Sequence, residues 1–144
     1  MLDRSLVERL RNVPVAGPVV SVYLGLPPDL DQLRTIGTRV KALVQPLRDE
    51  PAGKRLRTDL DRVVALAERA GGDLGRGMAL FVGSEAGLEE HVSLPTAVRD
   101  RAIIDTRPYL GPLEAMLAQF RRFCAVVVDR RTASIYRFYM GELE

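Results

Sequence analysis

Cysteine and histidine are scarce in this sequence, which has 144 residues and contains one of each. A single cysteine excludes an internal disulfide framework and a cysteine metal cluster, and it fits a reducing compartment. Cys124 stands within an apolar run, so we interpret it as a small core residue rather than a nucleophile.

Long hydrophobic runs are missing as well. None approaches the roughly 20 apolar residues that a transmembrane helix needs. The N-terminal segment 1–10 is amphipathic and carries acidic residues, which is unlike the apolar centre of a signal peptide. These absences predict a cytoplasmic protein that does not bind a membrane.

Neither sign of charge is in large excess. The 21 Lys and Arg residues against 19 Asp and Glu residues give a net charge of +2. This value does not by itself indicate a nucleic-acid-binding protein, so basic residues matter only where they cluster. The length and the 47% hydrophobic content suffice for one domain with a core.

The segment 19–24 consists mainly of β-branched and aromatic residues between two turn signals, Gly17-Pro18 and Pro27-Pro28. A strand that is apolar on both faces must be covered on both. The pattern therefore predicts a central strand, with helices above and below its sheet.

Apolar residues at helical spacing predict four helices, over residues 3–12, 29–50, 54–70 and 111–121. The second and third form a hairpin whose tip spans 48–57. Pro46 removes one backbone hydrogen bond and should kink the second helix or end it early. Gly71-Gly72 is expected to end the third helix.

Short apolar or alternating runs predict strands over residues 77–83, 89–94, 102–105, 123–128 and 133–140. The predicted fold class is an α/β (α+β) sandwich. In it, a mixed β-sheet is packed by the long helix hairpin and by the shorter helix at 111–121, and a C-terminal β-hairpin follows.

His91 shares one face of its strand with Ser93. A catalytic histidine needs a partner acid and a nucleophile, and no residue spacing supplies them. We therefore favour a surface histidine over a small hydrolase. No Gly-rich phosphate loop or metal-ligand pattern occurs, so neither a cofactor nor a metal is expected.

Several motifs follow the helix hairpin in order: Gly-Met-Ala-Leu-Phe-Val-Gly over 77–83, Arg-Pro-Tyr-Leu-Gly-Pro-Leu over 107–113, and Phe-Cys-Ala-Val-Val-Val-Asp-Arg-Arg over 123–131. In this order they resemble the N-terminal domain of the archaeal and eukaryotic class-one peptide-chain release factors, and most of all their bacterial release-factor-like relatives. The resemblance covers nearly the whole chain. Its motifs are strands and turns, so they indicate a fold more than an activity.

The resemblance implies a three-domain protein whose N-terminal domain reads the codon, whose middle domain hydrolyses peptidyl-tRNA through a Gly-Gly-Gln loop, and whose last domain binds partner factors. It implies that residues 1–120 form the N-terminal domain and that 121–144 open the middle one. The only Gly-Gly precedes Asp73, so the hydrolytic loop is absent and no enzyme is expected. We expect a piece of a longer protein rather than a natural short relative.

The codon-reading motifs of the family are altered here. Members that read stop codons carry Asn-Ile-Lys-Ser at the hairpin tip, where this chain has Asp-Glu-Pro-Ala-Gly-Lys over 49–54. The motif Tyr-x-Cys-x-x-x-Phe would fall on Tyr109, Gly111 and Ala115, and only the tyrosine matches. These differences argue against stop-codon recognition and make ribosome rescue or quality control at least as good a hypothesis.

Four basic residues crowd the predicted tip: Arg48, Lys54, Arg55 and Arg57. They are candidate contacts to rRNA or tRNA phosphates. The alternative is a solvated helix face whose arginines pair with Asp59 and Asp61 at helical spacing. Tyr109 is a further candidate, since it could stack on a base, although a tyrosine at such a turn more often packs against protein.

The sequence and the resemblance together predict a non-catalytic N-terminal module of a release-factor-like translation or ribosome-rescue protein. It would contact the ribosome or RNA and position a distal peptidyl-tRNA hydrolysis domain. The competing hypothesis is a homodimeric structural or regulatory domain without RNA binding. It would pair through the C-terminal hairpin, because unpaired apolar strand edges seek partners.

Overall fold

The computed structural model describes residues 2–26, 35–70, 75–119, 123–128, 133–139 and 142–143. The side chains of Ala52, Arg55 and Ala70, and those beyond residue 119, lie outside this description. Contacts divide the chain into two compact units, Met1–Leu110 and Gly111–Glu144.

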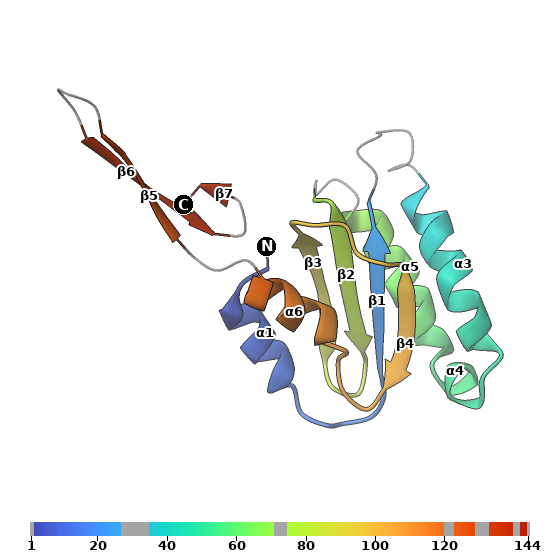
Figure 1. The fold of residues 1–144 in the computed structure, drawn as a ribbon. Helices are drawn as coiled ribbons and strands as arrows, with labels where there is room; N and C mark the ends of the chain where they lie inside the picture. Colours follow the sequence, from blue (N-terminus) through green and yellow to red (C-terminus); the bar gives the residue numbers. More distant parts are fainter. Residues whose placement is uncertain are drawn as a thin grey trace. The chain divides into compact units, whose positions relative to one another are not determined.

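The first unit is built on a four-stranded sheet with the strand order β3-β2-β1-β4 (Figure 1). Its strands are β1 (Val19–Gly25), β2 (Gly77–Gly83), β3 (Leu88–Leu94) and β4 (Arg101–Asp105). β1 pairs with β2 on one side and with β4 on the other, and its first six residues are buried. The prediction of a central strand at 19–24 is confirmed.

The helices of this unit are α1 (Arg4–Arg11), α3 (Ile36–Arg48), α4 (Pro51–Arg55) and α5 (Arg57–Ala70). α3 contains Pro46 and ends at Arg48. The part of the expected second helix at 29–34 and the Gly71-Gly72 cap lie outside the described residues. In the part of the chain that the structure describes, no helix has the length and apolar character needed to span a membrane.

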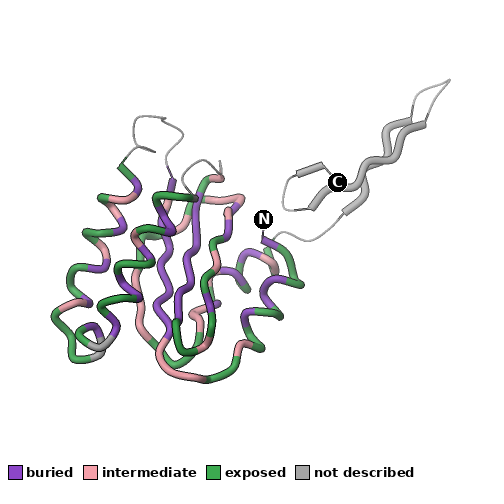
Figure 2. Tube along the Cα trace, turned by 180° about the vertical axis from the view of Figure 1, so that it is seen from behind, coloured by how far each residue is buried: buried purple, intermediate pink, exposed green. Residues whose placement is uncertain are grey.

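One face of the sheet packs against α3 and α5, and Figure 2 shows the central strands buried and the outer helix surfaces exposed. Alternate strand residues point to this face, and they meet apolar residues at helical spacing on both helices. The core includes Val20, Val22, Leu24, Met78, Leu80 and Val82 from the strands and Ile36, Val40, Val44, Leu60, Val63 and Ala67 from the helices.

α1 lies on the opposite face of the sheet (Figure 1). Asp3 caps its start, since the Asp3 carboxylate accepts a hydrogen bond from the Leu6 backbone N–H at 2.7 Å. Leu6 and two further apolar residues of α1 are buried. Arg9 forms an ion pair with Glu90 of β3 at 3.4 Å. Helices therefore lie on both faces of this sheet, as predicted.

All strand pairs of this sheet are antiparallel, which corrects the mixed sheet predicted from the sequence. A parallel neighbour of β1 would need a crossover with one helical pass. Here two antiparallel helices, α3 and α5, separate β1 from β2, so the chain re-enters the sheet at the end where β1 stopped. The α+β class itself is confirmed.

The second unit holds α6 (Gly111–Gln119), β5 (Phe123–Val128), β6 (Ala133–Tyr139) and β7 (Glu142–Leu143). β5 and β6 pair antiparallel, which confirms the predicted hairpin, and β7 adds a short third strand. The packing of α6 on the four-stranded sheet, the core role of Cys124, the division at 120/121 and dimerisation through this hairpin stay predictions.

The buried layer between the sheet and α3–α5 generates the first testable prediction. Leu80 is fully buried in this core. Leu80→Ala should lower the free energy of unfolding by about 2–5 kcal/mol, because it removes apolar burial and leaves a cavity. Urea unfolding monitored by circular dichroism measures the change. The exposed Lys41→Ala is the control and should change it by less than about 0.5 kcal/mol.

Candidate functional site

The tip of the helix hairpin is a compact turn made by α4 between α3 and α5. α4 was not predicted, because 49–53 contains Pro51 and Gly53 and resembles a break. Pro51 is the first residue of α4, where a missing N–H costs little. Gly53 is buried, and a Cβ there would lie 1.6 Å from the Leu47 carbonyl oxygen, so only glycine fits.

Arg48 is held in place by an acidic residue of the neighbouring helix. Its Nη2 donates to Asp61 Oδ1 at 2.7 Å, and 22% of the Arg48 side chain is exposed. The bridge joins the end of α3 to α5. The alternative interpretation expected Asp61 to pair with an arginine at helical spacing, whereas the partner observed here lies on another helix.

Asp59 has a different partner from the one that this alternative supposed. The residue is buried, and both its carboxylate oxygens accept hydrogen bonds from Ser84, one from the hydroxyl and one from the backbone N–H at 3.4 Å. Ser84 lies in the turn between β2 and β3. Asp59 therefore links the start of α5 to the β2–β3 turn by hydrogen bonds. Among the described residues, it forms no ion pair with an arginine.

Lys54 and Arg57 are the exposed cations of the tip. Among the described residues, neither forms an ion pair. The Arg55 side chain lies outside the described residues. Two exposed cations on a projecting turn can neutralise phosphates without reading sequence, although the acids Asp49 and Glu50 are exposed beside them.

Tyr109 is anchored to the central strand through its backbone. Its N–H donates to Ser21 Oγ at 2.9 Å, and its carbonyl oxygen accepts a hydrogen bond from the Tyr23 hydroxyl. Ser21 and Tyr23 are both 1% exposed. The two polar side chains of a buried strand thus find their partners on the segment that follows β4.

The ring of Tyr109 packs against protein. It meets the Tyr23 ring edge-on at a centroid distance of 5.9 Å. The Arg101 guanidinium lies 5.6 Å from the ring centroid, and Arg101 Nη1 donates to the Tyr109 hydroxyl at 2.8 Å. These are the packing contacts of the alternative interpretation, and base stacking by Tyr109 stays a prediction.

The structure does not bring Tyr109 and the basic tip together. Ser21 and Tyr23, which hold Tyr109, point to the face of the sheet opposite Val20 and Val22. Those two valines face α3 and α5, which carry the tip. A ligand that contacts both places would have to reach around the edge of the sheet.

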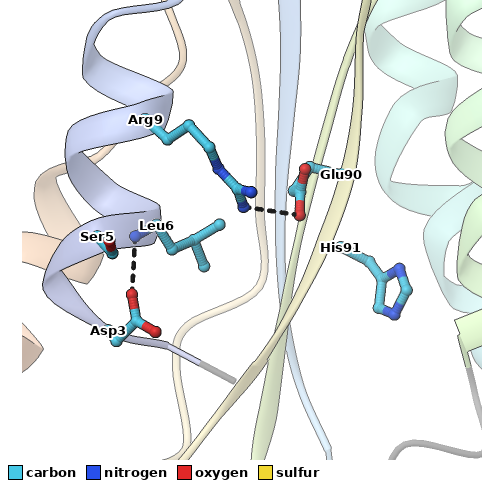
Figure 3. Close-up of a pocket in the computed structure, with 6 residues that line it drawn as sticks. All are labelled: Asp3, Ser5, Leu6, Arg9, Glu90 and His91. Atoms are coloured by element: carbon cyan, nitrogen blue, oxygen red, sulfur yellow. Dashed lines mark hydrogen bonds and ion pairs between the residues drawn. The ribbon is translucent and has the colours of Figure 1, made fainter.

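An open pocket of about 220 Å³ lies between α1 and β3 and includes Asp3, Ser5 and His91 in its lining. These residue types could suggest a hydrolase triad. Figure 3 shows, however, that the His91 ring points away from Asp3 and Ser5, and Asp3 already caps α1. Within the described residues, no group of three or more metal-binding side chains occurs. The pocket therefore does not support the hydrolase hypothesis.

Sequence reasoning missed the roles of Ser21, Tyr23 and Asp59. One signal was available, because a serine inside an otherwise apolar buried strand must find a hydrogen-bond partner. The identity of that partner could not be read, since Tyr109 lies 88 residues further along the chain.

No protein-family model matches this chain, and no curated protein does either. Several solved structures match it, and two of them do so over 100% of its length. One is described only as an archaeal protein, with 21% sequence identity, a TM-score of 0.52 and 44% of that chain covered. The other is the crystal structure of an archaeal translation termination factor, with 21% identity, a TM-score of 0.51 and 43% covered.

The shared feature is a fold. At 21% identity the likeness concerns the course of the chain and not its activity. This chain spans less than half the length of either structure. It resembles, in structure, part of a translation termination factor.

The anchoring of Tyr109 generates the second prediction. Ser21→Ala leaves the partly buried Tyr109 N–H without the Ser21 acceptor, which should cost about 1–3 kcal/mol of unfolding free energy. Tyr23→Phe removes the donor to the Tyr109 carbonyl oxygen and should destabilise the protein similarly. Because both hold the same segment, the double variant should be destabilised by less than the sum. Urea unfolding of the three variants measures these effects.

Ser93→Ala is the matched control, since Ser93 is a strand serine whose side chain makes no hydrogen bond within the described residues. It should leave stability nearly unchanged. A destabilisation by Ser21→Ala no larger than that by Ser93→Ala would show that the Ser21–Tyr109 bond does not anchor the segment.

Proposed function

We propose that this chain is a non-catalytic module of a release-factor-like translation or ribosome-rescue protein, and that it binds ribosomal or transfer RNA. The observation that carries the proposal is the structural likeness of the whole chain to part of an archaeal translation termination factor. The sequence resemblance points to the same family independently, through motifs at 77–83 and 107–113.

The proposed RNA contact is the tip made by α4 and the helix ends beside it. Lys54 and Arg57 are exposed there and have no acidic partner among the described residues. Arg55 adds a third cation from the same turn. Such a contact binds phosphates electrostatically, which gives an affinity independent of sequence and sensitive to salt.

Arg48 takes a supporting part in this proposal. Its ion pair with Asp61 holds the end of α3 against α5, and the Asp61 carboxylate neutralises the Arg48 charge. The RNA contact therefore falls on Lys54, Arg55 and Arg57, while Arg48 holds the shape of the tip.

Hydrolysis of peptidyl-tRNA lies outside the role that we propose for this chain. The Gly-Gly-Gln sequence is absent, since the only Gly-Gly precedes Asp73. The module positions a hydrolytic domain instead. Because the family's codon-reading sequence at the tip is replaced by Asp-Glu-Pro-Ala-Gly-Lys, we favour ribosome rescue or quality control over stop-codon reading.

Cosedimentation with ribosomes over a salt series tests the proposal. The unaltered chain should bind at low salt and bind more weakly as salt rises. The double variant Lys54→Ala, Arg57→Ala should have a lower affinity than the unaltered chain. The slope of log affinity against log salt should fall by about 1 for each phosphate that the variant no longer neutralises.

The control is Lys41→Ala, Arg99→Ala, which removes the same charge from exposed positions away from the tip. It should keep most of the affinity. Equal decreases in the two variants would assign binding to net charge rather than to the tip. Absence of binding by the unaltered chain at low salt would refute the proposal for this chain.

A further inference from the structure

The four-stranded sheet ends in β4, the strand that follows β1 in the strand order (Figure 1). The two end residues of β4, Arg101 and Asp105, are exposed, and the three apolar residues between them are half-buried. A terminal strand presents backbone N–H and C=O groups that another strand can pair with. β4 is short, but it has neither proline nor a charge in its middle.

The opposite edge of the sheet is different. β3 carries Glu89 and Glu90 in its first half, and each forms an ion pair with a helix arginine, Glu89 with Arg69 at 2.8 Å and Glu90 with Arg9 at 3.4 Å. Charges within an edge strand discourage pairing with a further strand. The edge that remains suited to pairing is therefore β4.

The sequence of β4, Arg-Ala-Ile-Ile-Asp, is complementary to itself when two copies run antiparallel. With Ile103 at the centre, Arg101 of one copy lies opposite Asp105 of the other, and the reverse pair forms at the far end. Opposite charges across a strand pair are stabilising, and like charges are destabilising. In registers shifted by two residues, Arg101 no longer lies opposite Asp105.

We infer that β4 is a dimerisation edge and that its partner is β4 of a second copy of this chain. The two-fold axis passes midway between the two Ile103 residues, perpendicular to the sheet. Such an arrangement is isologous and closes after two copies. It joins two four-stranded sheets into one continuous sheet and covers the half-buried Ile103 of both chains.

Within the part of the chain that the structure describes, Arg101 and Asp105 each have side-chain atoms that are not engaged and that can pair with the second copy. Arg101 uses Nη1 on the Tyr109 hydroxyl, which leaves its other guanidinium nitrogens for a carboxylate. Asp105 accepts from the Thr106 N–H at 2.6 Å through Oδ1. Among the described residues, Oδ2 of Asp105 accepts no hydrogen bond. An ion pair between the copies would therefore break neither contact.

The interface lies in the first unit and uses neither the tip nor the C-terminal hairpin. It does not depend on the proposed function, because the register argument uses only β4 and its place in the sheet. It also differs from the dimer expected from the sequence, which pairs through the C-terminal hairpin.

Sedimentation velocity of the 144-residue chain over a wide concentration range tests the inference. We expect a reversible monomer–dimer equilibrium that shifts toward monomer at higher salt, since the ion pairs are near the surface. Arg101→Asp alone and Asp105→Arg alone each place like charges at both ends of the interface. Each should raise the dimer dissociation constant about tenfold or more.

Charge complementation separates this interface from general destabilisation. The Arg101→Asp chain has an acid at both ends of β4, and the Asp105→Arg chain has a base at both ends. An equimolar mixture of the two should form a heterodimer about as well as the unaltered chain forms its dimer. The doubly substituted chain, which exchanges the two charges, should dimerise with itself.

Misfolding of the single variants cannot produce recovery in the mixture, and thermal unfolding by circular dichroism checks that each is folded. A chain that stays monomeric at every concentration overturns the inference. A dimer that neither single substitution weakens, or single variants that fail to associate when mixed, also overturns it and assigns association to another surface.

Discussion

The burial of β1 on both faces is the constraint on which the first unit depends. Its residues alternate between a purely apolar face, which accepts α3 and α5, and a face that carries Ser21 and Tyr23. Buried polar atoms must be hydrogen-bonded. The segment after β4 supplies the partners through the backbone of Tyr109. One strand thus organises the helical layer and also fixes a loop that begins at the edge of the sheet.

The charged residues around the hairpin divide into those that hold the fold and those that face solvent. Arg48 and Asp61 join two helices, and Asp59 joins α5 to the β2–β3 turn. Lys54 and Arg57 take no part in these contacts. The basic residues that cluster in the sequence therefore have different roles in the structure. Arg48 stabilises the tip, and Lys54 and Arg57 are exposed to a partner.

Periodicity predicted the helices and strands of the first unit well, because each spacing reports which side of a segment meets the core. Strand direction could not be predicted in the same way, since it depends on how many helical passes separate two strands. α4 was not predicted, because Pro51 and Gly53 usually indicate a break between helices. Here they form a tight helical turn, in which the position of Gly53 beside the Leu47 carbonyl oxygen leaves no room for a Cβ. Pairings such as Arg48 with Asp61 join different helices, and helical spacing carries no signal for them.

The helix pair between β1 and β2 has a consequence for the reach of the molecule. Because α3 leaves the sheet and α5 returns to it, one added helical turn in each would move the tip outward by about 5.4 Å. The strand register and the apolar stripe nearest the sheet would stay as they are. The length of the α3–α5 hairpin can therefore change without changing the sheet. A longer hairpin would carry the exposed cations of the tip to a surface further from the sheet.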